Sequence, residues 1–272
     1  MNRSVFPIRV FSNREEDPRI LGKINQIFKY RRGYISRIPK DEDIVFIFSG
    51  GLDSSITLDK IINDWNVNIF PLFIRRSARA TKFEEESVKF FVNYYKEKYP
   101  NNMQDLEIVE TEVPPLSFKK YPESDRLQKL GHPMRNAVLQ ALGVQYAQKL
   151  RATLVPNLHT VLTATVGDDS FPHSSLQALR SVNLSVCLDT GDWEWLVTSP
   201  LVDVEYEGCP IYKKDLIKYA IDHKLPLKKT RTCIEGGEKP DGTCPECLCR
   251  IRAFSEIGAI DPLDYQSKTP TE

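Results

Sequence analysis

A continuous apolar run, a glycine-hydroxyl loop and a helical pattern follow one another near the start of this chain and constrain its fold most. The run is Ile44-Val45-Phe46-Ile47-Phe48, which is typical of a buried parallel strand. The loop is Ser49-Gly50-Gly51-Leu52-Asp53-Ser54, and apolar residues then recur at near-helical spacing up to Trp65. Glycines allow a tight turn whose N–H groups converge on an anion, and the following helix end adds partial positive charge. The segment therefore predicts a phosphate-binding loop.

The loop is not a Walker A motif, because G-x-x-x-x-G-K-[ST] does not occur in the chain. The alternative interpretation is an ordinary glycine-rich turn between a strand and a helix, which a six-residue match in the right context disfavours. The pattern S-G-G-x-D-S resembles the PP-loop of the ATP pyrophosphatase superfamily. Members of that superfamily split ATP into AMP and pyrophosphate.

Composition indicates a globular enzyme without a strongly charged partner. The chain has 272 residues, enough for one large α/β domain or one domain with a small appendage. Lys+Arg and Asp+Glu both total 37, so no global field attracts nucleic acid or a membrane surface. The N-terminus lacks the apolar core of a signal peptide, and no apolar run reaches membrane-spanning length. We expect a cytoplasmic protein.

Strand and helix patterns alternate after the first forty residues. Strands are expected at 44–48, 67–74, 105–112, 152–156, 161–166 and 194–198. Helices are expected at 15–31, 55–65, 82–98, 135–150, 174–183 and 212–223. This order predicts an α/β fold, a Rossmann-like parallel sheet with helices on both faces and ligands beyond the carboxyl ends of the strands.

Four segments are expected on this basis. Residues 1–40 form an N-terminal helical extension, 41–228 an ATP-binding domain, 229–262 a cysteine-rich zinc-binding segment, and 263–272 a flexible tail.

The cysteine-rich segment has the spacing of a metal site. Cys244 and Cys247 form a C-x-x-C knuckle, and Cys233 lies across a Gly-Gly turn as a third ligand. Either Cys249 or Asp241 completes a tetrahedron, and Cys249 is preferred because thiolate is the softer donor for zinc. The alternatives are a redox C-x-x-C and buried apolar fillers. Four cysteines within 233–249 make both weaker than a structural zinc site.

Several ordered motifs resemble the 7-cyano-7-deazaguanine synthase (QueC) family over about residues 44–262. His132-Pro133-Met134-Arg135-Asn136 stands where that family has V-P-G-R-N. Ser199-Pro200-Leu201-Val202-Asp203, followed by Lys213, resembles its T-P-L-x-D…K segment. The cysteine motif with Glu235-Gly236-Gly237-Glu238, followed by Arg252-Ala253-Phe254, Gly258 and Asp261-Pro262, resembles its C-terminal signature.

The resemblance implies an activity, cofactors and an assembly. QueC enzymes adenylate the carboxylate of 7-carboxy-7-deazaguanine, pass the acyl group to ammonia and dehydrate the amide to a nitrile in a second ATP-dependent step. ATP, Mg²⁺ and Zn²⁺ are the implied cofactors. A homodimer acting on a small-molecule deazaguanine is the implied assembly.

The implied nucleotide site contains the loop and residues from two later segments. The loop residues are Ser49, Gly50, Gly51, Leu52, Asp53, Ser54 and Ser55, with Arg135 and Asn136 beside them. Asp53 is either a loop-stabilising N-cap or a magnesium contact. Arg135 and Lys213 are expected to stabilise charge on the transferring phosphoryl group. A surface salt bridge is the alternative role for Lys213.

The substrate region departs from the family pattern. Phe171-Pro172-His173-Ser174-Ser175 replaces the family's Y-P-D-C-R, which leaves Asp168, Asp169, Phe171 and His173 as substrate-binding candidates. Asp241 stands at the family's second cysteine, and Cys249 is extra. Ile74-Arg75-Arg76-Ser77-Ala78 replaces Y-G-Q-R-H.

These departures leave alternatives open. QueC-like proteins also occur in antiphage operons, including CBASS-type systems, where the activated deazaguanine is joined to a protein amine. A PP-loop enzyme that modifies tRNA is a further alternative, disfavoured by the neutral charge and the absence of an appended RNA-binding domain. A catalytically inactive adaptor is disfavoured by the intact loop.

Overall fold

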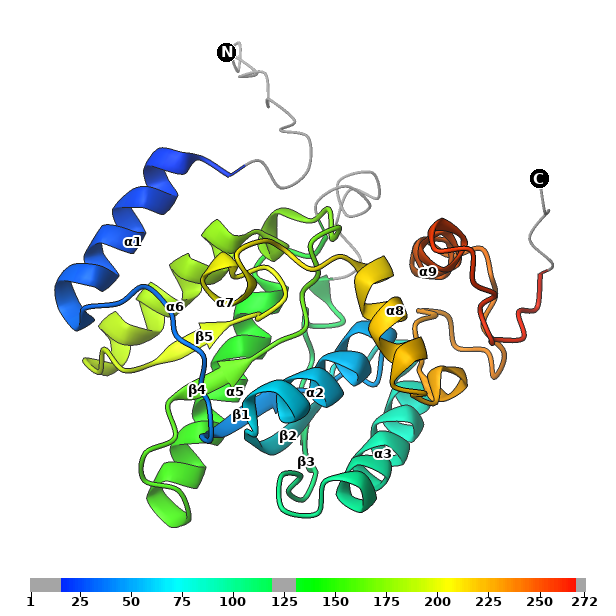
Figure 1. The fold of residues 1–272 in the computed structure, drawn as a ribbon, viewed down its shortest axis with the longest axis horizontal. Coiled ribbons are helices and arrows are strands. Elements are labelled where there is room, and N and C mark those ends of the chain that lie inside the picture. The colour runs from blue at the N-terminus through cyan, green and yellow to red at the C-terminus, as the bar shows by residue number, and fades with distance from the viewer. Residues whose placement is uncertain (1–15, 119–130, 268–272) are drawn as a thin grey trace, which may run out of the picture.

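The computed structural model describes residues 16–118 and 131–267 and contains one five-stranded sheet in that part of the chain (Figure 1). The strands are β1 (Asp43–Ile47), β2 (Asn68–Arg75), β3 (Glu107–Glu110), β4 (Thr160–Leu162) and β5 (Leu196–Thr198). Their order is β3-β2-β1-β4-β5, and all neighbouring pairs are parallel. Ile44 of β1 is in register with Ile69 of β2 on one side and Thr160 of β4 on the other.

Helices connect and cover these strands. The long helices are α1 (Pro18–Arg32), α2 (Leu52–Trp65), α3 (Thr81–Lys98), α5 (Arg135–Thr153), α6 (Leu176–Thr190), α8 (Lys213–Asp222) and α9 (Pro245–Glu256). Shorter pieces are α7 (Val204–Glu207) and the 3₁₀ turns η2 (Pro172–Ser174) and η3 (Leu227–Lys229).

The sheet is buried on both faces because its strands alternate between two cores. Ile44 and Phe46 of β1 pack with α2 and α3, whereas Val45 between them packs with α5 and α6. Successive side chains on a strand point to opposite faces, so an unbroken apolar run fits a strand covered on both sides. The predicted parallel α/β fold with helices on both faces is confirmed.

The strand order reverses between β1 and β4, and this position determines where ligands can bind. The chain moves outward from β1 through β2 to β3, then returns through α5 to the other side of β1. The loops leaving β1 and β4 therefore separate at the carboxyl edge of the sheet. A crevice at such a switch point is the usual ligand site of an open α/β sheet.

A third core joins the C-terminal helices to the start of α2. Leu52 and Ile56 of α2 pack with Ile217 of α8 and with Ala253 and Phe254 of α9. Figure 1 shows α8 and α9 beside each other at this end of the molecule. The cysteine-rich segment is thereby held against the helix that follows the Ser49–Ser54 loop.

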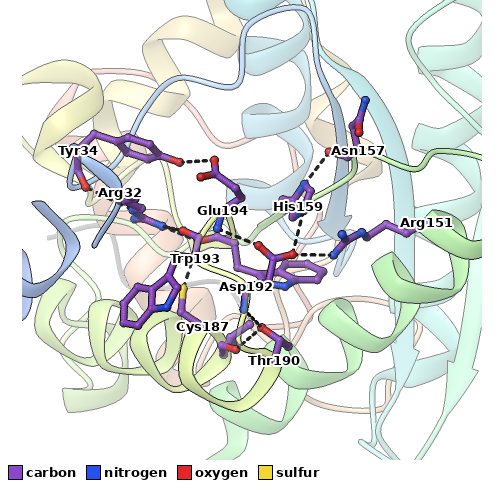
Figure 2. A network of polar contacts seen from close by, with 12 residues as sticks. Arg32, Tyr34, Arg151, Asn157, His159, Cys187, Thr190, Asp192, Trp193 and Glu194 are labelled. Atoms are coloured by element: carbon purple, nitrogen blue, oxygen red, sulfur yellow. Dashed lines mark hydrogen bonds and ion pairs between the residues drawn. The ribbon is translucent and has the colours of Figure 1, made fainter. Parts of the chain in front are cut away.

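Helix α1 is fixed to the β5 edge of the sheet beside α6 (Figure 1). The Arg32 guanidinium donates hydrogen bonds to the backbone carbonyls of Trp193 (3.2 Å) and Trp195 (2.7 Å). It also donates to the carbonyls of Tyr34 and Ile35. Figure 2 shows this contact next to a second group, in which Asp192 accepts from Arg151 and approaches His159. The N-terminal helix is therefore part of the packed fold.

Within the described residues most expected elements are present, with one wrong strand and two helices, α7 and α9, that were not expected. The predicted strand at 152–156 is wrong, because α5 continues through Thr153 and a turn follows in which Leu154 and Val155 N–H both donate to the Leu150 carbonyl. Short apolar runs do not distinguish a strand from a helix end. Helix α9 lies inside the expected zinc-binding segment.

The ends of the expected segments are only partly described. Residues 1–15 of the N-terminal extension and 268–272 of the tail lie outside the described residues. Within the expected tail, Gln266 and Ser267 N–H donate to the carbonyls of Pro240 and Asp241. Among the helices in the described ranges, none combines the length and apolarity needed to traverse a lipid bilayer.

Candidate functional site

The Ser49–Ser54 loop is shaped by Gly50 and anchored through its backbone. Gly50 has φ +69°, and a Cβ there would lie 2.7 Å from the Glu84 carbonyl oxygen, so a larger residue is excluded. The Gly50 carbonyl accepts hydrogen bonds from the Ser87 hydroxyl (2.7 Å) and from the Arg231 N–H (2.8 Å). Helix α3 and the segment before the cysteine cluster thus hold this loop from two sides.

The loop forms one wall of a cavity of about 240 Å³ at the carboxyl edge of the sheet. Four loop residues line it: Ser49, Gly51, Asp53 and Ser54. The Ser49 and Ser54 hydroxyl oxygens are 3.0 Å apart, and the Gly51 N–H donates to the Ser49 hydroxyl at 3.3 Å. The remaining wall combines charged or polar side chains with apolar ones: Ile47, Phe48, Phe73, Ile74, Arg76, Glu84, Arg135, Asn136, Leu139, Gln140, Thr163, Ala164 and Thr165.

Three expected loop contacts do not line this cavity with their side chains. Leu52 is buried in the core that joins α2, α8 and α9. Ser55 is buried, and its carbonyl accepts the Tyr95 hydroxyl at 2.7 Å. Any contribution of Gly50, Leu52 and Ser55 to an anion is limited to their backbone groups.

Asp53 and Lys213 form an ion pair at the mouth of the loop. The Lys213 ammonium lies 2.9 Å from Asp53 Oδ2, while Asp53 Oδ1 is buried and has no hydrogen-bond partner among the described residues. The N-cap of α2 is Gly51, without a side-chain cap, so the N-cap role considered for Asp53 is wrong. Burial alone would lower the pKa of Lys213, but the Asp53 carboxylate outweighs it and raises that pKa above its ordinary value. Lys213 is thus cationic at neutral pH.

Arg135 is a cationic group in the cavity wall. It opens α5, and its Nε donates to the side-chain oxygen of Asn136 at 3.4 Å. Burial and then the neighbouring Arg76 charge lower the pKa of Arg135 below its ordinary value. Arg76 is itself paired with Glu84 at 2.8 Å. The cavity wall therefore presents two guanidinium groups, and the Lys213 ammonium lies beside it through its ion pair with Asp53.

A second cavity of about 610 Å³ adjoins the first, because Asn136 and Gln140 line both. It runs between α5 and α6, with walls that include Met134, Ala137, Val138, Ala141, Val144, His173, Val182 and Val186. His173 stacks on Phe171 with ring centroids 5.2 Å apart, and its Nε2 is buried with no partner among the described residues. Burial and the Arg135 charge lower the pKa of His173, which favours the neutral ring.

The two expected substrate carboxylates have local partners. Asp168 Oδ1 accepts the Lys213 backbone N–H at 3.1 Å, at the start of α8. Asp169 accepts the Phe171 N–H (3.1 Å) and the Ser174 hydroxyl (2.7 Å), which shapes the loop leading to His173. Both aspartates thus organise the backbone between β4 and the cation Lys213.

Four potential ligand atoms gather in the cysteine-rich segment. Atoms of Cys233, Asp241, Cys244 and Cys247 lie within 4.8 Å of one another. The Cys233 and Cys244 sulfurs are 4.0 Å apart, close to the roughly 3.8 Å expected for two thiolates on tetrahedral zinc. Cys249 is not in this group and lies exposed on α9. The preference for Cys249 as the fourth ligand is therefore corrected to the alternative, Asp241.

The metal-like group is connected to the loop by Arg231. Its guanidinium donates to the carbonyls of Cys233, Glu235 and Gly237, and its N–H donates to the Gly50 carbonyl. Buried thiols and a carboxylate at these distances fit a closed four-ligand zinc site.

Some residues of the site were not singled out from the sequence. Glu84 and Gln140 line the first cavity, and Glu246 lies in the first turn of α9. Burial raises the pKa of Glu246, opposed next by the charge of Lys213, so this carboxyl faces the same group of charges. The apolar pattern of α5 does not indicate that the polar residue Gln140 is buried. Pro245 after Cys244 is a helix-start signal that would have identified α9.

The arrangement is suited to activating a phosphate ester. A loop with N–H and hydroxyl donors, two arginines and a lysine converge at a switch point, and the buried Asp53 Oδ1 faces the same region. Such groups neutralise phosphate charge and fix its orientation.

Comparison with known proteins gives one family. The sequence model described as "Queuosine biosynthesis protein QueC" matches residues 43–258. The chain is 26% identical over 230 residues to a 7-cyano-7-deazaguanine synthase of Acetivibrio thermocellus, covering 83% of this chain and 98% of that protein. It is 26% identical over 236 residues to one from Thermoplasma acidophilum, covering 84% and 93%.

A solved structure is similar at a lower level. It is the U34-tRNA thiolase NcsA from Methanococcus maripaludis with its [4Fe-4S] cluster, at 12% identity and a TM-score of 0.39, covering 93% of this chain and 84% of that one. Both the sequence identity and the structural overlap are low. The family match, by contrast, spans the loop, the cavity and the cysteine cluster. The chain belongs to the QueC family.

Proposed function

We propose that this protein is an ATP-dependent carbon–nitrogen ligase that activates the carboxylate of 7-carboxy-7-deazaguanine. The observation that carries the proposal is the convergence of Arg135 and the Asp53–Lys213 pair on the Ser49–Ser54 loop in a QueC-family chain. The relatives named above are 7-cyano-7-deazaguanine synthases and are matched over most of their length.

The first step joins the two substrates. A carboxylate oxygen of the acid attacks the α-phosphorus of ATP, and the bond to pyrophosphate breaks. The Ser49–Ser54 loop would hold the departing pyrophosphate through its N–H and hydroxyl donors. Arg135 and Lys213 would stabilise the charge that spreads over the phosphoryl oxygens. Asp53 would hold Mg²⁺ through its unpaired oxygen, and that ion would neutralise further phosphate charge.

The second step transfers the acyl group to nitrogen. An amine attacks the acyl carbon, AMP leaves, and the amine loses a proton, which yields an amide. Ammonia as the amine, followed by an ATP-dependent dehydration, gives 7-cyano-7-deazaguanine. A protein amine is the alternative acceptor. The second cavity supports this alternative, because it adjoins the first at Asn136 and gives a bulkier amine room to enter.

The cysteine cluster would bind zinc in a structural role. Cys233, Cys244, Cys247 and Asp241 form the proposed ligand set. Together with the loop contact through Arg231, this metal would keep the C-terminal segment in place.

The activity is tested by product analysis with ATP, magnesium, the deazaguanine acid and ammonium. We expect AMP and pyrophosphate that depend on the acid, with the rate reduced at least about 100-fold in Ser49→Ala and Asp53→Ala. Ser255→Ala, an exposed serine on α9, is the matched control and should be fully active. Production of ADP and phosphate without AMP would disprove the proposal.

The acceptor is determined in the same assay. Nitrile formation at ordinary turnover assigns ammonia. A mass gain on a candidate partner protein, without free nitrile, assigns a protein amine.

A further inference from the structure

Gln140 occupies a position where a polar side chain requires an explanation. It lies in the second turn of α5, the helix that crosses from β3 to β4 over the switch point. One turn later, Gly143 approaches Val161 of β4 and Ile47 of β1 so closely that a Cβ would lie 2.7 Å from the valine. This part of α5 is thus pressed against the sheet, and Gln140 is only 2% exposed.

The side-chain oxygen of Gln140 is unpaired. Gln140 Oε1 is buried and has no hydrogen-bond partner among the described residues. Buried polar atoms are nearly always hydrogen-bonded, because an unmade bond costs stability that an apolar residue of similar shape would not lose. Since Gln140 lines both cavities, its carboxamide is available to a ligand bound in them.

The cavity walls indicate which part of a ligand would meet Gln140. Phosphate and carboxylate groups are matched by Ser49, Ser54 and Arg135 at the charged end. Ile47 and Leu139, which share the cavity wall with Gln140, are apolar and suit a flat ring. A carboxamide oxygen accepts hydrogen bonds, so the complementary group is an N–H at the edge of that ring.

We propose that Gln140 is a specificity-determining residue that accepts a hydrogen bond from the N–H edge of an amino-substituted heteroaromatic base. This inference rests on the proposed function, whose two substrates, ATP and 7-carboxy-7-deazaguanine, both carry such an edge. The experiment distinguishes which base is read. A site built to pair with an N–H rejects an analogue without it, because its own acceptor then stays unpaired.

The test compares Gln140→Met with wild type and with Gln148→Met. Methionine has a similar volume but no comparable acceptor, and Gln148 is an exposed glutamine on the same helix. We expect Gln140→Met to raise KM for one substrate about tenfold, the effect of one lost hydrogen bond of ordinary strength. Its melting temperature should equal or exceed that of wild type, because an unpaired buried oxygen is removed.

Two analogues identify the base. Purine riboside triphosphate lacks the amine of adenine, and 7-carboxy-7-deazahypoxanthine lacks the exocyclic amine of the acid. If Gln140 accepts a hydrogen bond from adenine, the KM for ATP is higher in Gln140→Met than in wild type. The KM for purine riboside triphosphate is then the same in both proteins. If it reads the acid, the same pattern appears with the second pair.

A uniform loss of kcat with a lower melting temperature would show a structural role and overturn the inference. Changes in both KM values below about twofold would overturn it as well. If wild type releases no AMP, the proposed function fails, and calorimetric titration with ATP and with the acid tests Gln140 directly. A tenfold weaker affinity for one of them in Gln140→Met supports the inference, and unchanged affinities refute it.

Discussion

Lys213 and Asp53 are 160 positions apart in the sequence and meet in one ion pair of 2.9 Å. Lys213 is almost fully buried, and it opens α8, which packs on the start of α2. Both residues are candidates from motif resemblance. Their pairing is a tertiary contact, and nothing in either local pattern indicates it. At this scale a sequence identifies reactive side chains but not their partners.

Replacing Lys213 by methionine should lower kcat by about 100- to 1,000-fold, the usual cost of removing one preorganised charge contact in a transition state. The variant also leaves Asp53 without its partner. Lys214→Met is the matched control, because Lys214 is exposed and its ion pair with Glu256 is long, at 3.9 Å. Pyrophosphate release measures the effect.

The direction of the Lys213 pKa shift determines how the Asp53–Lys213 pair depends on pH. Its pKa in the folded protein is raised above the ordinary value of 10.5, so it stays charged as pH rises through neutrality. The stability that this pair contributes is present at pH values below that ordinary pKa and is lost only at higher pH.

A kcat in Lys213→Met within about twofold of wild type would contradict the catalytic role of Lys213.

The cysteine-rich segment shows at the scale of an element why spacing alone did not select the fourth ligand. Cys244 is the N-cap of α9 and Cys247 lies in its first turn. Two further residues rotate a side chain by about 200° around a helix, so Cys249 faces away from Cys247. The C-x-x-C group was predictable from sequence, but the choice between Cys249 and Asp241 depended on where the helix begins.

We predict one zinc per chain, with Asp241→Ala losing the metal to a chelator much faster than wild type. Cys249→Ser serves as the matched control and should retain the metal, because its sulfur lies outside the ligand group. Mass spectrometry of the metal content after dialysis measures both. Undiminished zinc in Asp241→Ala together with loss in Cys249→Ser would reverse the assignment.

Gln140 and Arg76 show that a correctly predicted element does not reveal which of its polar residues line the site. Helix α5 was expected from its apolar pattern, and its observed bounds extend the expected range by three residues. A buried glutamine within it has no periodic signature, because the same residue type is exposed at Gln145 and Gln148. Arg76 belongs to a local basic cluster, Arg75-Arg76 with Arg79, that favours phosphate or carboxylate binding, but the sequence does not indicate which of these arginines lines the cavity. Both residues line the first cavity, whose walls come from segments that are far apart in the sequence and meet only in the folded sheet.

For the whole molecule, the parallel sheet was predictable because strand and helix patterns alternate and each connection is long enough for a helix, although β3 has a glutamate at each end. The apolar stripe of residues 15–31 predicts a helix packed on the main domain, and Ile24 and Phe28 of α1 are indeed buried in its core. Arg32 adds polar contacts, because its guanidinium donates to the backbone carbonyls of Trp193 (Figure 2) and Trp195. Backbone acceptors have no sequence signal.

Arg32→Ala should lower the free energy of unfolding by about 2–3 kcal/mol, because several carbonyls lose a charged donor. For a chain of this length that corresponds to a melting temperature roughly 4–12 °C lower. Lys23→Ala, an exposed residue on the same helix, should change it little. Thermal unfolding followed by circular dichroism measures both variants. Equal melting temperatures would show that α1 contributes no stability through Arg32.

The contact between the Gly50 carbonyl and the Arg231 N–H has a consequence for how this protein can diverge. Both partners are main-chain atoms, so neither is altered when the side chain at position 231 changes. Substitution of Arg231 can therefore remove the side-chain hydrogen bonds to the carbonyls around Cys233 while the backbone hydrogen bond to Gly50 remains. Proline is the exception, because it has no N–H to donate. An Arg231→Pro substitution would therefore remove the hydrogen bond to the Gly50 carbonyl and release the loop on that side.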